Sequence, residues 1–220
     1  MKKYLIILTL IFSGLQSLYS QNMKFTVFVE PKFSWMTPDL KNVDNDGTKL
    51  GVNIGLNVDK FFAPNYAIMT GISIDNTGGF LKYDLVSGKP IKTNGGMDTV
   101  PTGSTLEYKL QYINVPIGLK LKTNEIGYFT FFTHLGINAG VNIKATGEVE
   151  GYELENDNIS DEIKLFNLGY YIGLGTEYSI GGNTAIVLGI TYNNGFVDIT
   201  TDSNNKVTNS NFAIRIGILF

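Results

Sequence analysis

The chain has 220 residues, 17% of them charged, no cysteine and a formal net charge of −3. This length fits one domain, and the lack of cysteine excludes a disulfide framework, a thiolate metal site and a lipoprotein anchor. The slightly acidic balance argues against a nucleic-acid partner, which would need a basic face.

Residues 1–20 are predicted to form a signal peptide. Lys2 and Lys3 precede a short apolar run, and a small residue stands ahead of a cleavage site before Gln21. Cleavage there removes two lysines and no acids, which changes the net charge from −3 to −5. A membrane-anchoring helix is the alternative, but the apolar run is too short to span a bilayer core of about 30 Å. Export leaves a periplasmic β-protein or an outer-membrane barrel for residues 21–220.

Eight later stretches alternate apolar with small or polar residues at the period of two that a β-strand requires. The clearest alternation lies in 49–59, where aliphatic residues alternate with glycine, asparagine and aspartate. A soluble barrel would put its aliphatic face inside and Lys, Glu and Thr on its wet surface. Small residues on the second face fit a narrow lumen instead, with the aliphatic face against lipid. The predicted strands are 24–36, 49–59, 66–75, 105–122, 128–144, 165–180, 184–192 and 211–220.

The fourth of these strands changes its apolar phase in the middle. Even-numbered residues from Leu106 to Tyr112 are mostly apolar, and odd-numbered residues from Ile113 to Leu121 are apolar after them. Since a strand cannot turn over inside lipid, the change predicts a β-bulge at this point, next to Pro116.

The connections between the strands alternate long, short, long, short, long, short, long. Outer-membrane barrels have short periplasmic turns and long external loops, and each predicted strand has at least about nine residues, enough to cross when tilted. The sequence therefore predicts an all-β fold: a closed eight-stranded antiparallel up-and-down transmembrane β-barrel with both termini on the periplasmic side. Aromatic residues near the strand ends are predicted to form interfacial girdles. These are Phe61, Phe62, Tyr66, Tyr128, Tyr178 and Phe220 at the periplasmic side, and Trp35, Tyr170, Tyr192 and Phe212 at the external side.

The stretch 106–122 resembles a segment of the PorT-like outer-membrane β-barrel family of Bacteroidota, which carries a tyrosine, an aliphatic residue, and then a proline followed by aliphatic residues and a lysine. The glycine-rich segment 134–140, the terminal Phe220 and the leader ending before Gln21 also fit. The resemblance implies an eight-stranded outer-membrane barrel and carries no catalytic residues to this chain. Some relatives are linked to secretion and gliding machinery. The matching residues here are Tyr112, Ile113, Val115, Pro116, Ile117, Leu119 and Lys120.

Charged residues in the inward phase of the strands predict a filled lumen. An eight-stranded barrel has just enough interior for side chains, and an unpaired charge there would cost several kcal/mol. The first and last strands are neighbours in a closed barrel, so Glu30 and Arg215 are expected to lie close together. The alternative is a thin water path past the glycines of the second, fifth and sixth strands. The predicted structural lumen cluster is Glu30, Lys120, His134, Glu177 and Arg215.

One inward-facing pattern contains the residue types of a hydrolase. Ser73, Asp75 and His134 share the inward phase and would make a Ser-His-Asp arrangement if they met. Barrel hydrolases act near the membrane surface, and His134 is expected to lie too deep for a substrate. A hydrogen-bonded lumen histidine is therefore the favoured interpretation.

Two loops are rich in acidic or amide side chains. The stretch 42–47 resembles the start of a calcium loop, but it begins with an asparagine and has Asn53 where a bidentate acid is needed. Turns made by Asx side chains explain this stretch more simply. The loop after Ala145 is expected to be solvated and mobile, with divalent-ion bridging to lipopolysaccharide or contact with a basic partner as alternatives. Its acidic residues are Glu148, Glu150, Glu153, Glu155, Asp157, Asp161 and Glu162.

The sequence predicts an integral outer-membrane barrel without enzymatic activity, a structural or accessory component of an envelope assembly, with a secretion-related role as its most specific form. The alternative is an adhesin-like surface barrel that binds through its four long external loops. No cofactor or metal is expected. Expected partners are outer-membrane lipid and lipopolysaccharide, an envelope protein, and the barrel-assembly machinery during insertion, for which Phe220 is the predicted signal. Apolar residues of the external part that would support binding are Phe80, Leu81, Tyr83, Val86, Tyr152 and Leu154.

Overall fold

The computed structural model describes residues 22–93, 96–152, 154–202 and 205–220. The predicted signal peptide 1–20 and the acidic Glu153 lie outside these residues. Each long strand pairs antiparallel with the next one along the chain, and the last pairs with the first, which closes the ring and confirms the predicted fold class. The barrel strands are β1 (Met23–Pro38), β3 (Lys49–Ala63), β4 (Tyr66–Tyr83), β7 (Ser104–Lys122), β8 (Phe129–Val149), β10 (Phe166–Gly181), β11 (Thr184–Gly195) and β12 (Val207–Leu219).

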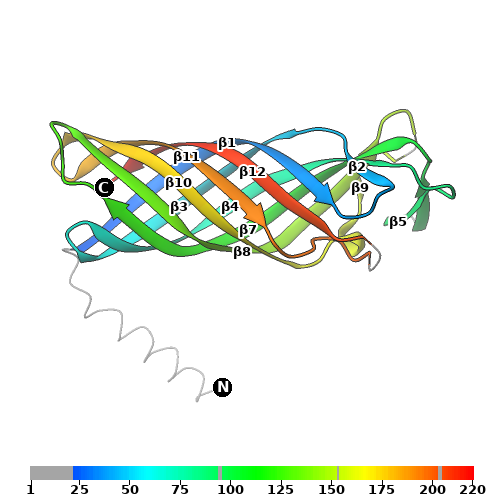
Figure 1. The fold of residues 1–220 in the computed structure, drawn as a ribbon, viewed down its shortest axis with the longest axis horizontal. Coiled ribbons are helices and arrows are strands. Elements are labelled where there is room, and N and C mark those ends of the chain that lie inside the picture. The colour runs from blue at the N-terminus through cyan, green and yellow to red at the C-terminus, as the bar shows by residue number, and fades with distance from the viewer. Residues whose placement is uncertain (1–21, 94–95, 153, 203–204) are drawn as a thin grey trace, which may run out of the picture.

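The two ends of the barrel differ in the length of their connections. Short turns join β3 to β4, β7 to β8 and β10 to β11 at the end where the C-terminus lies (Figure 1). The opposite end carries the long connections and the small elements within them. This asymmetry assigns the short turns to the periplasmic side and the long connections to the outside. The small elements are β2 (Val43–Asn45), β5 (Lys89–Thr93), β6 (Gly96–Val100), β9 (Asp157–Asn158) and the short 3-10 helix η3 (Ser160–Glu162).

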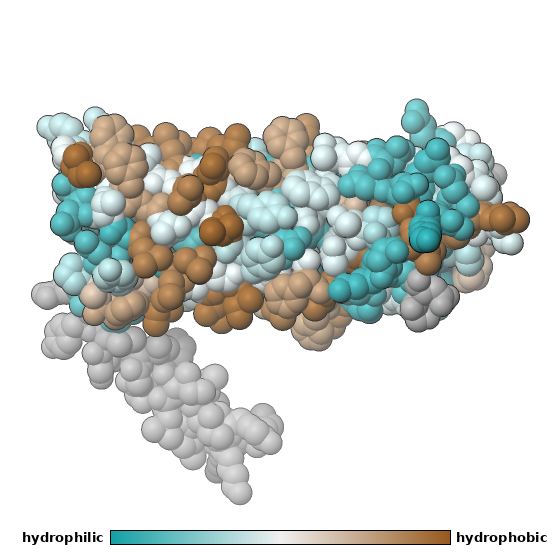
Figure 2. Space-filling model, viewed as in Figure 1, coloured by the Kyte–Doolittle hydropathy of each residue, from teal (hydrophilic) through white to brown (hydrophobic). Residues whose placement is uncertain are grey.

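The outer face of the barrel wall is apolar over the part next to the short turns. Ile54, Ile214 and Ile216 are about half exposed there, while Arg215, between Ile214 and Ile216, is buried. Figure 2 shows apolar residues spread over the wall and hydrophilic residues gathered over the end that carries β2, β5 and β9. Such an apolar band with a polar interior is the pattern of a barrel wall in contact with lipid. Separately, within the described ranges no helix is long and apolar enough to cross a membrane.

A bulge does lie at the predicted level, between Gln111 and Tyr112 in the pairing of β7 with β8, but its extra residue is on β8 and the backbone of β7 does not change phase. Even-numbered residues of β7 face inward from Leu106 to Lys120, and the strand keeps one register with β4. The apolar phase changes because the surroundings change: near Lys120 the outer face meets lipid, whereas near Leu106 the inner face meets an apolar core. The bulge lies in β8, where Ile143 has no partner between the pairs Gln111–Lys144 and Tyr112–Asn142.

The four external connections fold together with the external ends of β1, β4, β7 and β8 into one apolar core, here called the external cap. At its centre the hydroxyl groups of Tyr83 and Tyr108 share a hydrogen bond of 2.6 Å. The second and fourth connections are joined by an ion pair of 2.5 Å between Lys89 and Asp202. The core residues of the cap are Met36, Val43, Leu81, Tyr83, Ile91, Val100, Leu106, Tyr108, Leu110, Tyr112, Ala145, Val149, Leu154, Ile159, Ile163, Ile199 and Val207.

The acidic loop belongs to this cap through its apolar residues, which corrects the expectation of a wholly solvated segment, whereas its acidic Glu150, Glu155 and Asp161 are exposed. Leu154, Ile159 and Ile163 of the loop are buried in the cap core. The carboxylate of Glu162 accepts a hydrogen bond of 3.0 Å from the backbone N–H of Lys92. Of the apolar residues that were expected at the loop tips, some are buried in the cap and others are exposed. Leu81, Tyr83 and Leu154 are buried, whereas Val86 is 97% and Tyr152 is 49% exposed.

Candidate functional site

The middle of the lumen is occupied by an ion pair between the first and last strands. Arg215 Nε on β12 lies 2.6 Å from Glu30 Oε1 on β1, and both side chains are buried. Asn53 donates a second hydrogen bond, of 2.8 Å, to the other carboxylate oxygen of Glu30. The guanidinium carbon of Arg215 lies 4.4 Å from the centre of the Phe28 ring, which adds a cation–π contact. The structure thus brings Glu30 and Arg215 together as the closure of the barrel requires.

A second charged group lies closer to the periplasmic end. Lys120 Nζ lies 2.6 Å from Asp59 Oδ2 and 2.7 Å from Glu177 Oε1, and it stacks 4.7 Å above the ring of Phe132. Lys122 pairs with the same Glu177 at 2.9 Å. Lys120 and Glu177 therefore meet each other, as members of the predicted cluster, but they do not pair with Glu30 or Arg215. The predicted lumen cluster did not include Asp59, although Asp59 ends the predicted strand 49–59 and is in its inward phase.

A third ion pair lies on the external side of the lumen. Lys32 on β1 pairs with Asp75 on β4, and Asn114 donates a hydrogen bond of 3.0 Å to the other carboxylate oxygen. Asp75 is therefore held by Lys32 and Asn114, while His134 has its contact elsewhere. The hydrogen bonds of a Ser-His-Asp triad are not formed in this structure.

His134 lies in the lumen within an aromatic cluster. Its Nε2 lies 3.2 Å from the hydroxyl of Thr191, and its ring meets those of Phe132 and Tyr171 edge-on at 5.7 Å and 5.5 Å. The paired position on the neighbouring strand β10 has to be glycine, because a Cβ on Gly173 would overlap His134 Nε2. Small residues in the lumen phase thus leave room for large ones on the neighbouring strands.

Tyr171 and Phe132 are lumen residues that the sequence reasoning missed. Tyr171 is in the inward phase of β10, between the glycines of 169 and 173, so the period of two alone could have placed it. Its hydroxyl reaches along the lumen wall over Gly136 of β8 to β7, where a Cβ on Gly118 would overlap it. Aromatic side chains are easily assigned to the lipid face by their hydropathy, and this preference hid the two positions.

The space left in the lumen is small. Two hollows of about 30 Å³ each remain, one between Arg215 and Ser73 and one among the asparagines nearer to the cap. A water molecule needs at least about 10–15 Å³ of such space and two to four polar partners. Asn138 lines both hollows, and its Oδ1 has no hydrogen-bond partner among the described residues. These hollows have room for single water molecules rather than for a solute.

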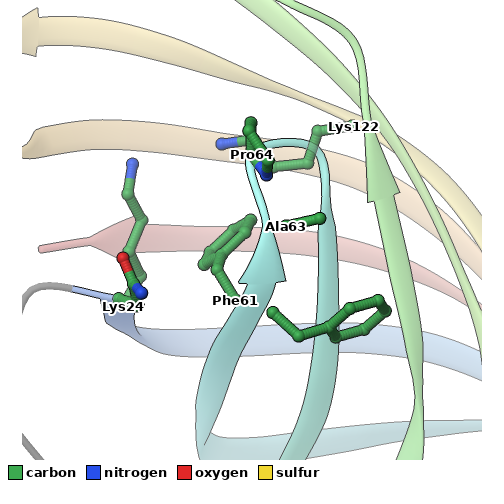
Figure 3. A pocket seen from close by; sticks show the side chains of 7 residues that line it. Lys24, Phe61, Ala63, Pro64 and Lys122 are labelled. Atoms are coloured by element: carbon green, nitrogen blue, oxygen red, sulfur yellow. The ribbon is translucent and has the colours of Figure 1, made fainter.

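The periplasmic mouth is the open part of the interior. A hollow of about 400 Å³ there is lined by Lys24, Lys122, Phe61 and the turn that includes Pro64 (Figure 3). Phe61 is inward, under the ammonium group of Lys122 at 5.2 Å, so its assignment to the lipid girdle is wrong. Aromatic contacts elsewhere do lie at the outer rim. They are Phe62–Tyr66, Tyr128–Tyr178, Phe129–Tyr178 and Phe25–Phe220 near the short turns, and Trp35–Tyr192 and Tyr170–Tyr192 near the long ones.

The stretch 42–47 makes a turn of the kind expected from its amide side chains. Asn45 Oδ1 accepts a hydrogen bond of 2.8 Å from the backbone N–H of Gly47. The carboxylate of Asp46 accepts a hydrogen bond from the hydroxyl of Thr105. Within the part of the chain that the structure describes, no three His, Cys, Asp or Glu side chains are grouped so that they could hold a metal ion.

Comparison with known proteins adds a family match and several structural likenesses. Residues 14–217 match the family model of the outer membrane protein beta-barrel domain. No curated protein sequence matches the chain. Similar solved structures include the attachment invasion locus protein Ail of Yersinia pestis, with 14% identity, coverage of 91% of this chain and 100% of that chain, and a TM-score of 0.43.

Two further solved structures are similar at the same level. Neisserial surface protein A has 13% identity, coverage of 89% of this chain and 95% of that chain, and a TM-score of 0.46. The outer membrane protease OmpT from Escherichia coli has 11% identity, coverage of 91% and 96%, and a TM-score of 0.45. No function is transferred from any of these likenesses.

Proposed function

Because the chain belongs to the outer membrane protein beta-barrel domain family, we propose that it acts in the outer membrane as a structural or accessory component of an envelope assembly, without enzymatic activity. In this proposal its partners are outer-membrane lipid and lipopolysaccharide around the wall, the barrel-assembly machinery during insertion, and an envelope protein at the periplasmic end.

One observation carries the proposal: the interior is filled and capped toward the outside and open toward the periplasm. Three layers of ion pairs cross the lumen, at Lys32, Arg215 and Lys120, and the external cap closes the barrel beyond them. Transport through the barrel would require these pairs to separate, and each separation would leave buried charges unpaired. The hollow at Lys24 and Lys122 faces the periplasmic side, where envelope partners are found.

The proposed lack of enzymatic activity is supported by what surrounds the one histidine. His134 is buried between Phe132 and Tyr171 and contacts Thr191, and the hollow that Tyr171 and Thr191 line has only about 30 Å³. A general base must reach the proton of a substrate, directly or through one water. A substrate larger than water has no place in this cluster.

A secretion-related role is the finer form of the proposal. It rests on the resemblance of 106–122 to PorT-like barrels of Bacteroidota. In the structure this segment contributes both to the cap, through Leu106 to Tyr112, and to the lumen, through Lys120. Because residues of this segment pack in both the cap and the lumen, packing constrains the side chains along its whole length. Such a segment is well suited to characterise a family.

Affinity capture from native outer membranes tests the proposal. A tag inserted beside Val86, which is fully exposed on the cap, leaves the periplasmic mouth free. We expect one defined envelope protein to co-purify in near-stoichiometric amount after mild detergent extraction. A tagged de novo designed barrel of eight strands serves as the control for non-specific recovery. Recovery of the same proteins with both barrels would contradict the assembly role.

The adhesin-like alternative rests on the exposed apolar tips of the cap. Val86, Met97 and Tyr152 are 97%, 65% and 49% exposed, and Tyr152 borders a hollow of about 260 Å³ on the cap. Exposed apolar residues at a rim with a hollow are a common feature of binding surfaces. Attachment of cells that express the wild-type barrel, compared with a Val86→Ser, Met97→Ser, Tyr152→Ser variant, separates this alternative from the assembly role.

A further inference from the structure

The ion pairs at the periplasmic mouth do not include all of its lysines. Three lysines face this part of the interior, Lys24, Lys120 and Lys122, and the acids that pair with them are Asp59 and Glu177. Lys120 and Lys122 use both acids. Lys24 has no ion pair with any described residue. Farther inside the lumen, by contrast, Arg215 and Lys32 each have their own carboxylate.

The lysine without an ion pair borders an open hollow. Lys24 and Lys122 both line the hollow of about 400 Å³, which is within the usual range of ligand pockets, about 300–1,000 Å³. The same two lysines and Pro64 also border a second hollow of about 260 Å³ toward the turns at 123–125 and 182–184, so the two hollows share a wall. Figure 3 shows the ring of Phe61 between Lys24 and Lys122.

The lining defines the chemistry of a ligand. Two ammonium groups require an anion, and the inward ring of Phe61 together with Pro64 offers an apolar wall beside it. Lys24 and Phe61 are in the inward phase of their strands, as the buried Thr26 and Asp59 show. Both side chains therefore face the interior at the periplasmic end of the barrel.

We propose that this hollow is a binding site for an acidic peptide segment of an envelope protein, with a carboxylate held by Lys24 and Lys122 and an adjacent apolar side chain against Phe61. The proposal rests on the function proposed above and names the surface and the partner chemistry that it would use. Extended peptides and carboxylates are commonly captured by such a combination of donors and a side-chain pocket. Beyond Lys120 the lumen is filled by ion pairs, which close the inner end of the site.

The test measures peptide binding to the purified full-length barrel in phosphatidylcholine nanodiscs by fluorescence anisotropy. The probe is a fluorescein-labelled Gly-Gly-Phe-Glu-Phe-Glu peptide with an amidated C-terminus, and the matched peptide has Gln in place of Glu. We expect wild type to bind the acidic peptide about tenfold more tightly than the Gln peptide, since hydrogen bonds between charged groups are stronger than those to a neutral amide. Lys24→Met removes the charge, keeps the apolar stem and should abolish this preference, whereas Lys24→Arg should keep it.

Lys60→Met is the matched control, because Lys60 lies at the same end on the outward phase of β3. It should keep the wild-type preference. Folding of every variant is verified by the heat-dependent shift in electrophoretic mobility of a closed barrel. Equal preference in wild type and Lys24→Met, or an equal loss in Lys60→Met, would overturn the site. Loss of the Lys24-dependent binding in phosphatidylglycerol nanodiscs would also overturn it, because lipid headgroups would then occupy the hollow.

The outcomes separate this site from the proposed function. A defined complex captured from membranes, without Lys24-dependent peptide binding, would overturn the site and leave the assembly role in place. Lys24-dependent binding of the acidic peptide, without any captured complex, would support the site and contradict the assembly role.

Discussion

Arg215 Nε lies 2.6 Å from Glu30 Oε1, although 185 residues separate the two along the chain. They lie opposite each other in the seam between β1 and β12, between the register pairs Val29–Ile216 and Lys32–Ala213. The contact therefore spans the seam between the first and last strands, which closes the barrel. Its two charges are buried in the lumen, where no bulk water can replace either partner.

Replacement of Arg215 by alanine should destabilise the barrel, because Glu30 would keep a buried charge without its partner. Removing one member of a buried pair costs about 3–5 kcal/mol. The expected result is a lower melting temperature of the purified barrel in detergent, with partial recovery in the double variant Glu30→Gln, Arg215→Met. Ile214→Ala, on the lipid face beside it, is the control. An unchanged melting temperature in Arg215→Ala would contradict the pairing.

Because the wall faces lipid, a charged substitution is expected to cost more stability near the membrane midplane than near an interface. Ile54 faces outward near the middle of β3, and Leu50, which is 73% exposed, faces outward near its external end. Arginine on the lipid face costs about 2–4 kcal/mol at the midplane and about 0–1 kcal/mol near an interface. Ile54→Arg should therefore lower the stability in phospholipid vesicles clearly more than Leu50→Arg. Equal effects of the two substitutions would place this part of β3 outside the membrane.

Purified barrel should form no stable channel in a planar bilayer. The ion pairs of Arg215, Lys120 and Lys32 fill the lumen at three levels, and the hollows between them have about 30 Å³. An eight-stranded barrel has little interior beyond its side chains. The measurement is single-channel recording of wild type beside a large porin as the positive control. Stable conductance on the nanosiemens scale would refute the filled lumen.

The external cap should become less stable in alkaline solution. Burial raises the pKa of Tyr83 and of Tyr108 above the usual value near 10, so the folded cap holds both protons more tightly than the unfolded cap does. Its stability is fully present below about pH 10 and falls as the pH rises further, because only the unfolded tyrosines ionise readily there. Limited proteolysis of the cap across this range is the measurement. The variant Tyr83→Phe, Tyr108→Phe should lose much of this pH dependence, and an unaltered profile would exclude these tyrosines as its cause.

Deletion of Phe220 should reduce insertion into the outer membrane. Two backbone hydrogen bonds of 2.9 Å join Phe220 to Phe25, and the two rings stack at 6.1 Å on the outer face of the seam. Without this residue the last strand ends one pair earlier and leaves polar groups of β1 unpaired at the interface. Membrane fractionation compares the deletion with Phe220→Tyr, which keeps the ring and the backbone contacts. Equal amounts of folded barrel in the wild type, the deletion and Phe220→Tyr would show that Phe220 is not an insertion signal.

The sequence by itself determined the barrel, its strand count and the side of the membrane on which each connection lies. These properties follow from local patterns, because alternation with a period of two reports which face of a strand meets lipid. It also brought Glu30 and Arg215 together, since the first and last strands of a closed barrel are neighbours. Chain order gives which strands are neighbours, and the period of two gives which of their side chains face the lumen.

Only the tertiary structure decided where the membrane pattern ends and the cap begins. In β7 the apolar phase changes at Tyr112 while the backbone keeps its alternation, whereas in β8 the apolar phase continues past Ile143 while a bulge turns the backbone over. Hydropathy reports what surrounds a side chain and not which way the strand turns. The surroundings of Tyr112 are built by Ile91, Ile159 and other residues of separate loops. That packing depends on contacts distant in sequence, so no local pattern contains it.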